Sequence, residues 1–354
     1  MNTLDYIQIE EKYGAHNYHP LDVVLERGEG VWVYDVDGNR YLDCLSAYSA
    51  LNQGHVHPRI LKALTDQAKK ITLTSRAFRN DQLPLFYKEL SELTGYSMSI
   101  PMNSGAEAVE TALKLARKWA YNVKGVPKYQ AEIIVAQGNF HGRTISIVSC
   151  STEQLYKDAF GPFTPGFTVV PYGDAEAISQ AITPNTAAVM IEPIQGEGGV
   201  NCPSPDYLQQ VRGICDRAEL LLIFDEVQTI RMNMGGIQGA EGVRPDLTAL
   251  AKLIGGGFRV IQDVPPYILA SEEPLRFAGL NSIGLRRRSR HPSVILATAR
   301  DVARRQPLRA RRERDQEEGH RVEDVCTPEA YARDPALVHQ FYDARRARAA
   351  TTAE

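Results

Sequence analysis

Short runs of consecutive apolar residues recur in the middle of the chain and predict buried strands. These runs lie within residues 132–136, 187–191 and 220–224. Each run is too short to form a stable helix of its own, and apolar residues at successive positions are typical of strands buried on both faces of a parallel sheet. The pattern therefore predicts an α/β fold with a mostly parallel sheet flanked by helices.

Other stretches predict a hairpin and two amphipathic helices. Residues 31–43 form two short β-type runs around Asp37-Gly38, a dipeptide typical of tight hairpin turns. Apolar residues recur at helical spacing across residues 58–73. A second helical pattern begins at residues 104–106 and continues through Trp119.

Polar residues follow each of the three predicted strands. Residues 138–144 follow the first strand, Glu192 follows the second, and Asp225 follows the third. Because the carboxyl ends of parallel strands form the ligand crevice of open α/β sheets, these segments predict one binding site. Alternatively, each acid is a solvated residue that merely ends its strand.

Asp225 and Lys252 together indicate a type of chemistry. Lys252 lies 27 residues after Asp225 (252 − 225) and shortly before three glycines at 255–257. A lysine amine can hold an aldehyde cofactor as a Schiff base, and a buried carboxylate can pair with a protonated pyridine nitrogen. The pair suggests a pyridoxal phosphate site, although an Asp and a Lys at this spacing are weak support on their own.

Two further segments could complete such a site. A helix start at Ser104, Gly105 and Ala106 offers free backbone N–H groups, a hydroxyl and the positive end of the helix dipole, which suit an anion. Phe140 could stack on a flat ring, and Arg143 could bind a carboxylate through two hydrogen bonds. The alternatives are a capping turn without a ligand, a core phenylalanine and a surface arginine.

Composition narrows the class of protein. A chain of 354 residues can bury a large core, and its net charge of −3 excludes a polyelectrolyte. Five scattered cysteines lack C-x-x-C spacing, which argues for a reducing compartment and against a zinc site. The N-terminus has no secretory pattern, and no apolar run reaches the roughly 20 residues of a membrane span. We therefore expect a cytoplasmic protein without a metal or membrane segment.

The basic residues are distributed unevenly along the chain. All eleven lysines lie in residues 1–252, whereas eighteen of the twenty-nine arginines lie in the remaining 102 residues. A shift of this size suggests two stretches of different origin. We predict an N-terminal segment with a β-hairpin at 1–45, a cofactor-binding large domain at 46–285, and an atypical Arg-rich tail at 286–354, disordered or helical.

Seven motifs in order resemble one family. They are HNYHP, AYSALNQGH, MNSGAEAVETALKLARKW, GNFHGRT, EPIQGEGG, FDEVQT and GVRPD followed by Lys252. The stretch from about Tyr13 to Thr229, and more patchily to about Val260, closely resembles the ornithine aminotransferases of class III. The resemblance implies the large domain of fold-type I enzymes that depend on pyridoxal 5'-phosphate, with a seven-stranded type of sheet wrapped by helices.

For the cofactor, the resemblance implies a phosphate cradle and an aromatic wall. Ser104, Gly105 and Ala106 match the residues that hold the phosphate. Phe140 resembles the aromatic that stacks on the ring, and His141 occupies a position where many relatives have Trp or His.

The resemblance also implies the catalytic residues. Asp225 matches the partner of the pyridine nitrogen, and Gln228 matches a contact to the ring hydroxyl. Lys252 matches the Schiff-base lysine, which also moves a proton between the substrate carbon and the cofactor.

For the substrates, the resemblance implies L-ornithine as amino donor and 2-oxoglutarate as acceptor. Tyr18 and Arg143 match the groups that hold the α-amino and α-carboxylate end of ornithine, and Tyr48 lines the same pocket. Glu197 resembles an acid that masks an arginine until 2-oxoglutarate arrives, and Glu192 is a nearby site residue. Glutamate 5-semialdehyde, which cyclises to pyrroline-5-carboxylate, and glutamate are the expected products. The expected assembly is a homodimer.

Several alternatives stay open. Acetylornithine and 4-aminobutyrate aminotransferases are near relatives, although the context of Tyr18 and Tyr48 favours ornithine. Residues 230–236 replace the Gly-rich loop of the family, and the sequence beyond Val260 departs from it. We therefore expect the C-terminal small domain to be missing or replaced and turnover to be reduced. An inactive pseudoenzyme is the next alternative.

The C-terminal tail suggests one alternative function that is not enzymatic. Residues 286–314 hold eleven arginines, a pattern that is usually solvated and often disordered. A basic module that binds nucleic acid or protein is conceivable, but no aromatic residues interleave with the arginines, which disfavours nucleic acid. Residues 319–348 are similar to a stretch of bacterial sirtuin deacylases without the cofactor loop that precedes it there, so a non-catalytic remnant is expected.

Overall fold

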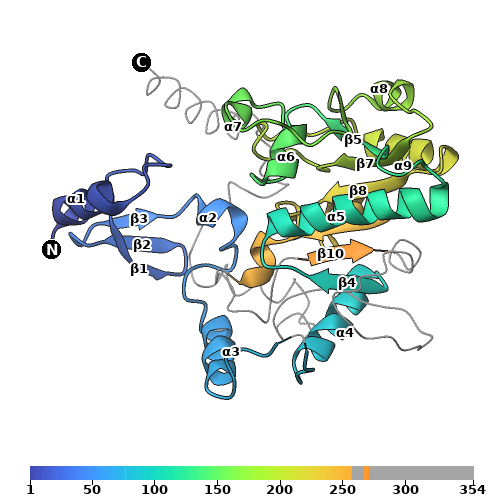
Figure 1. The fold of residues 1–354 in the computed structure, drawn as a ribbon. Helices are drawn as coiled ribbons and strands as arrows, with labels where there is room; N and C mark the ends of the chain where they lie inside the picture. The colour runs from blue at the N-terminus through green and yellow to red at the C-terminus, as the bar shows by residue number, and fades with distance from the viewer. Residues whose placement is uncertain (76, 257–266, 271–354) are drawn as a thin grey trace.

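The computed structural model of the chain describes residues 1–75, 77–256 and 267–270 (Figure 1). The predictions for residues 286–354 and for a missing or replaced small domain fall outside these residues. The division into segments at 45 and 285 stays a prediction.

A seven-stranded sheet forms the centre of the molecule. Its strands in spatial order are β4 (Met98–Pro101), β10 (Tyr267–Ala270), β9 (Leu247–Leu250), β8 (Leu221–Asp225), β7 (Thr186–Ile191), β5 (Glu132–Ala136) and β6 (Phe167–Val170). The five strands from β9 to β6 are parallel, whereas β10 is antiparallel to both of its neighbours. The mostly parallel sheet predicted from the apolar runs is confirmed, with strand ends within one residue of those predicted.

Alternate residues of each strand enter two separate hydrophobic cores. Ile133 and Val135 of β5 belong to one core, whereas Ile134 and Ala136 belong to the other. All six residues of β7 are buried, because the sheet is covered on both faces. A strand in this position needs apolar side chains at every residue, which explains the continuous runs in the sequence.

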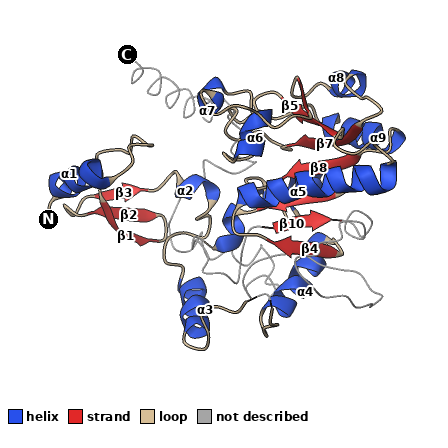
Figure 2. Ribbon diagram, viewed as in Figure 1, coloured by secondary structure: helices blue, strands red, loops and turns tan. Residues whose placement is uncertain are grey.

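Helices cover the two faces of the sheet (Figure 2). The first core is closed by α5, and the second by α8 and α9. The helices and short helical turns of the described residues are α1 (Thr3–Tyr13), α2 (Ser46–Ser49), α3 (Pro58–Ala68), α4 (Leu83–Thr94), α5 (Gly105–Trp119), η1 (Ala120–Lys124), α6 (Ile145–Cys150), α7 (Gln154–Lys157), α8 (Ala175–Gln180), α9 (Tyr207–Arg217), η2 (Ile230–Met232), α10 (Gly236–Glu241) and η3 (Lys252–Gly255).

The predicted helix at residues 58–73 ends earlier than its apolar spacing suggests. It stops at Ala68, and Ile71 and Leu73 are 44% and 52% exposed. Because these two side chains bury little surface, packing does not offset the entropy of extending the helix.

The predicted hairpin is confirmed as part of a smaller antiparallel sheet. Its strands are β1 (Leu25–Glu29), β2 (Trp32–Asp35) and β3 (Arg40–Leu42). Gly38 occupies the left-handed conformation that the turn requires (φ 88°). Asp35 holds the turn by accepting hydrogen bonds from the backbone N–H and side-chain amide of Asn39 and from the Tyr41 hydroxyl.

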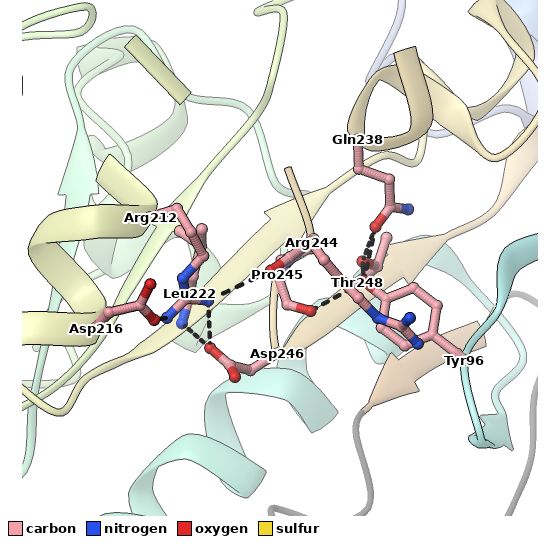
Figure 3. Close-up of polar contacts among 9 residues, drawn as sticks. All are labelled: Tyr96, Arg212, Asp216, Leu222, Gln238, Arg244, Pro245, Asp246 and Thr248. Carbon is pink, nitrogen blue, oxygen red and sulfur yellow. Dashed lines mark hydrogen bonds and ion pairs between the residues drawn. The ribbon is translucent and has the colours of Figure 1, made fainter. Parts of the chain in front are cut away.

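A buried polar network joins Tyr96, which follows α4, to α10 and β9 (Figure 3). The Tyr96 hydroxyl lies 2.7 Å from Gln238 Oε1, 2.8 Å from Thr248 Oγ1 and 3.1 Å from the Pro245 carbonyl. Burial raises the pKa of Tyr96 above 10, so the hydroxyl keeps its proton as a donor.

A second polar connection joins α9 to the strands. Asp246 Oδ2 accepts hydrogen bonds from the Leu222 backbone N–H and from Arg212 Nη1, both at 2.7 Å. Arg212 also pairs with Asp216 one helical turn along α9 at 2.7 Å (Figure 3). This connection fixes the start of β8, at whose other end Asp225 lies.

Tyr96→Phe should destabilise the fold, because the variant leaves buried acceptors without their shared donor. We expect a loss of about 1–2 kcal/mol in the free energy of unfolding, measured by denaturant titration. Tyr129→Phe is the matched control, since Tyr129 is 91% exposed. Equal losses in the two variants would show that the network adds nothing.

Candidate active site

The carboxyl end of β8 carries a buried ion pair. Asp225 Oδ2 lies 2.7 Å from Nδ1 of His141, and their side chains are 4% and 0% exposed. The other oxygen of Asp225 accepts the Val227 backbone N–H at 3.0 Å. Burial alone would lower the pKa of His141, but the hydrogen bond and charge of Asp225 raise it above its usual value. The imidazole therefore favours its charged form, which pairs with the Asp225 carboxylate.

His141 has one polar atom without a partner. Its Nε2 is buried and contacts no hydrogen-bonding group among the described residues. An unpaired donor of this kind is costly unless another group or a water satisfies it. His141 was predicted to bind the cofactor, and its contact with Asp225 gives it a role through that carboxylate.

Glu192 lies at the carboxyl end of the neighbouring strand β7 and is 5% exposed. Its Oε2 accepts the Phe140 backbone N–H at 3.0 Å, which joins the loops after β7 and β5. Burial raises the pKa of Glu192 to about 8, the positive charge of His141 opposes the rise, and Asp225 adds to it. The carboxyl group is therefore largely protonated at neutral pH.

Lys252 begins η3, two residues after β9. Its backbone is left-handed (φ 52°), a conformation that costs a residue other than glycine roughly 1–2 kcal/mol. Burial lowers the pKa of the amine below its usual value. The negative charges of Glu197 and Asp225 oppose this shift and the positive charge of Arg231 adds to it, so the amine lies within the electrostatic field of these groups.

The start of α5 lies against the loops that carry these residues. Ser104 caps the helix by accepting the Glu107 N–H at 3.1 Å. A side chain at Gly105 would lie 3.1 Å from Cβ of Ala251 and 3.2 Å from Cγ1 of Val227. The first N–H groups of a helix have no partner within it, so this close approach places free donors beside the ends of β8 and β9.

The loop after β5 closes on the same helix. Gly142 has a φ of 132°, and a Cβ there would lie 2.9 Å from Cβ of Ala106. Glycine is therefore required at this position both for the backbone conformation and for the contact. The loop carries Phe140, His141 and Arg143, so the Gly142–Ala106 contact sets their distance from the helix start.

Arg143 is surrounded by aromatic rings. Its Nη2 lies 3.2 Å from the Tyr18 hydroxyl, which raises the pKa of the guanidinium. Its centre is 5.5 Å from the rings of Tyr18 and Tyr156 and 5.8 Å from that of Phe140. Tyr18 and Arg143, 125 positions apart in the sequence, thus lie in contact, while their predicted roles toward a substrate stay a prediction.

The remaining predicted residues lie in the surrounding loops. Tyr48 lies in α2, which packs against η3. Gln228 packs beside Gly196, where an added Cβ would lie 2.8 Å from its Oε1. Glu197 is exposed and acts on Lys252 through its charge.

Two residues of this region were not predicted. Tyr156 of α7 packs edge-on against Phe140 with ring centroids 5.6 Å apart. Gln195, 1% exposed, donates to the Gln137 carbonyl at 2.7 Å and accepts from Asn201 at 3.0 Å. Gln195 belongs to the EPIQGEGG motif, whereas nothing in the sequence around Tyr156 marks it.

Comparison with known proteins places this chain in a family. The family model described as aminotransferase class-III matches residues 13–265. The chain belongs to the class III aminotransferases. This membership confirms the resemblance found in the seven motifs and the fold-type I large domain. A second family model, described as Udp N-acetylglucosamine O-acyltransferase domain 2, matches residues 263–318, too small a part to place the chain.

Individual class III aminotransferases share most of this chain. The ornithine aminotransferase of Brevibacillus brevis is 59% identical over 253 residues, which are 71% of this chain and 63% of that protein. The structure of the Toxoplasma gondii ornithine aminotransferase, with PLP at partial occupancy in its active site, superposes with a TM-score of 0.76. It is 40% identical, and the match covers 80% of this chain and 66% of that one.

An acetylornithine aminotransferase from Elizabethkingia anophelis superposes with a TM-score of 0.69 at 43% identity, covering 80% of this chain and 68% of that one. This class III aminotransferase chain spans 63% of the length of the Brevibacillus relative. The sirtuin resemblance of residues 319–348 finds no support in these comparisons. No helix in the described ranges is both long and apolar enough to cross a membrane.

Glu192→Gln should change how stability depends on pH. The native carboxyl, with a pKa of about 8, keeps a proton that the unfolded chain releases near 4.5. The free energy of unfolding of the unaltered chain therefore carries a penalty that grows between these two pH values and stays constant above them. Glutamine removes that penalty, so the variant should gain on the order of a few kcal/mol relative to the unaltered chain between about pH 5 and about pH 9.

Denaturant titrations at the two pH values measure this gain. Glu26→Gln is the control, because Glu26 is exposed on the N-terminal sheet. A difference between the unaltered chain and Glu192→Gln that does not vary with pH contradicts the assignment of a raised pKa.

Proposed function

We propose that this class III aminotransferase binds pyridoxal 5'-phosphate and transfers the δ-amino group of L-ornithine to 2-oxoglutarate. The observation that carries the proposal is the juxtaposition of a buried, His-paired carboxylate with a desolvated lysine beside a helix start. The similarity to ornithine aminotransferases over most of the chain supports the same activity. Glutamate 5-semialdehyde and glutamate would be the products.

The residues present fit this cofactor. Ser104, Gly105 and Ala106 would hold its phosphate through N–H groups that the helix leaves unpaired, and a Cβ at Gly105 would be tightly packed against Ala251 and Val227. Phe140 would cover the ring face, with Gln228 near its hydroxyl. When bound, the cofactor supplies an electron-withdrawing ring that stabilises negative charge on the neighbouring substrate carbon.

The residues of the chain would divide the remaining work. Asp225, paired with His141 at 2.7 Å, would supply the carboxylate that holds a proton on a pyridine nitrogen. Lys252 would hold the cofactor aldehyde and, once displaced by the substrate amine, would remove a proton from the carbon that bears the nitrogen. The lowered pKa of Lys252 increases the neutral fraction able to accept that proton.

Substrate orientation would come from Arg143, Tyr18 and Tyr48. The guanidinium forms two parallel hydrogen bonds to the α-carboxylate, and the Tyr18 hydroxyl at 3.2 Å completes the binding of that end. The δ-amine then points toward Lys252. Glu197 is exposed, and its charge acts on Lys252. It would mask an arginine until 2-oxoglutarate arrives.

The assembly and location are part of the same proposal. A homodimer in the cytoplasm is supported by the resemblance to the family. The competing readings are an acetylornithine or 4-aminobutyrate aminotransferase and a pseudoenzyme. The contact between Tyr18 and Arg143 favours ornithine, because it prepares a site for an α-amino acid end.

Cofactor binding is tested by the covalent attachment of pyridoxal phosphate to Lys252. Added pyridoxal phosphate should give the full chain a visible absorption band, and borohydride reduction should leave the cofactor's mass on the peptide that contains Lys252. Lys252→Ala should lose both signals, whereas Lys128→Ala, which removes an exposed lysine, should keep them. Labelling at other lysines without a visible band would favour a pseudoenzyme.

The identity of the amino donor is tested by comparing an amine that carries an α-carboxylate with one that lacks it. Arg143→Lys should lower kcat/KM for ornithine by about 10–100-fold, because lysine keeps the charge but loses the two-pronged geometry. Reaction with 1,4-diaminobutane, which lacks the carboxylate, should change little in the same variant. Equal losses for both amines would contradict the proposed role of Arg143.

A further inference from the structure

The turn that carries Tyr48 has an unusual backbone. Ser46, Ala47, Tyr48 and Ser49 have φ values of 47°, 47°, 56° and 72°, so α2 is a left-handed turn built without glycine. Left-handed conformations are unfavourable for such residues and normally occur singly. Four in succession persist only where the surrounding structure holds them.

Asp43 holds the beginning of this turn. Its Oδ1 accepts the backbone N–H groups of Leu45 at 3.0 Å and Ser46 at 2.9 Å. Its Oδ2 lies 2.7 Å from Nε2 of His55, and the two side chains are 17% and 22% exposed. Burial alone would raise the pKa of Asp43, but the hydrogen bonds of His55 and of the two N–H groups lower it. One carboxylate thus joins both ends of the segment 43–55.

His55 is in turn attached to the N-terminal sheet. Its backbone N–H donates to the Gly30 carbonyl at 2.7 Å, and its carbonyl accepts the Gly30 N–H at 3.1 Å. A Cβ at Gly28 of β1 would lie 2.6 Å from the His55 ring, so only glycine admits the imidazole there. The position of His55 is therefore fixed independently of the turn.

The far side of the turn faces the catalytic region. Asn52 donates to the Ser49 carbonyl at 2.7 Å and accepts from Arg231 Nη1 at 3.4 Å. The turn packs against η3, which begins with Lys252. The left-handed turn consequently lies between His55, which the N-terminal sheet holds in place, and the predicted catalytic Lys252.

We propose that Asp43 and His55 are positioning residues that hold the left-handed turn 46–49 and so fix Tyr48 relative to Lys252, setting the selectivity for the amino donor. The selectivity part rests on the proposed function. Neither side chain needs to touch a substrate, since both act through the backbone that carries Tyr48. Loss of the clamp lets the turn relax to right-handed or extended conformations and moves Tyr48 away from the pocket.

The experiment compares Asp43→Asn and His55→Gln with the full unaltered chain. Hydrogen–deuterium exchange of the amides in residues 44–52 should accelerate at least about tenfold in both variants. The ratio of kcat/KM for ornithine to that for 4-aminobutyrate should fall by about tenfold or more, while the visible band with pyridoxal phosphate persists. Asp66→Asn is the control, because it removes an exposed ion pair with Lys62 on α3.

A rescue variant separates positioning from general stability. Ala47→Gly makes the left-handed conformation favourable, so Asp43→Asn combined with Ala47→Gly should recover part of the lost selectivity and slow the exchange of the turn. If Asp43→Asn merely destabilises the protein, the added glycine should leave the selectivity unrecovered.

The outcomes separate this inference from the proposed function. An unaltered chain that gives no visible band overturns the proposed function together with the selectivity role. A chain that gives the band but shows unchanged exchange and selectivity in Asp43→Asn overturns the positioning role alone.

Discussion

The contact between Asp225 and His141 is the interaction on which the site depends. A buried carboxylate costs several kcal/mol if it is left unpaired, and the imidazole at 2.7 Å offsets this cost. The two residues come from different strand ends, so the contact also fixes the loop after β5 against the loop after β8. The loop after β5 positions Phe140 and Arg143 and contacts the start of α5 through Gly142.

The parallel sheet makes such a contact possible. Every residue of β7 and β8 is buried, and alternate side chains enter the two cores on opposite faces. The polar residues are therefore confined to the ends of the strands, and the parallel direction brings Glu192 and Asp225 to the same edge. The hydrogen bonds of Tyr96 and Asp246 hold the opposite ends of β9 and β8.

Much of this arrangement could be predicted from local patterns. The apolar runs predicted three central strands, and the Asp-Gly dipeptide predicted the hairpin. The end of the third run predicted the position of Asp225. Local patterns do not predict which side chains far apart in the sequence come into contact. The Asp225–His141 contact joins residues 84 positions apart, and Tyr156 reaches Arg143 only because α7 folds back over the loop. The left-handed turn at 46–49 contradicts the preferences of its own residues, so propensity could not predict it.

The antiparallel strand β10 has a consequence for how the helix start is held. In the sheet, β4 pairs only with β10 among the described strands, and β4 leads directly into the Ser104 cap of α5. Yet β10 occupies residues 267–270, just past the last residue of the class III match at 265. The strand that leads into the Ser104 cap is therefore joined to the sheet by four residues outside the matched family segment, whereas the helix itself also packs on β9 through the first core. Strand and helix start are consequently held by two different stretches of the chain.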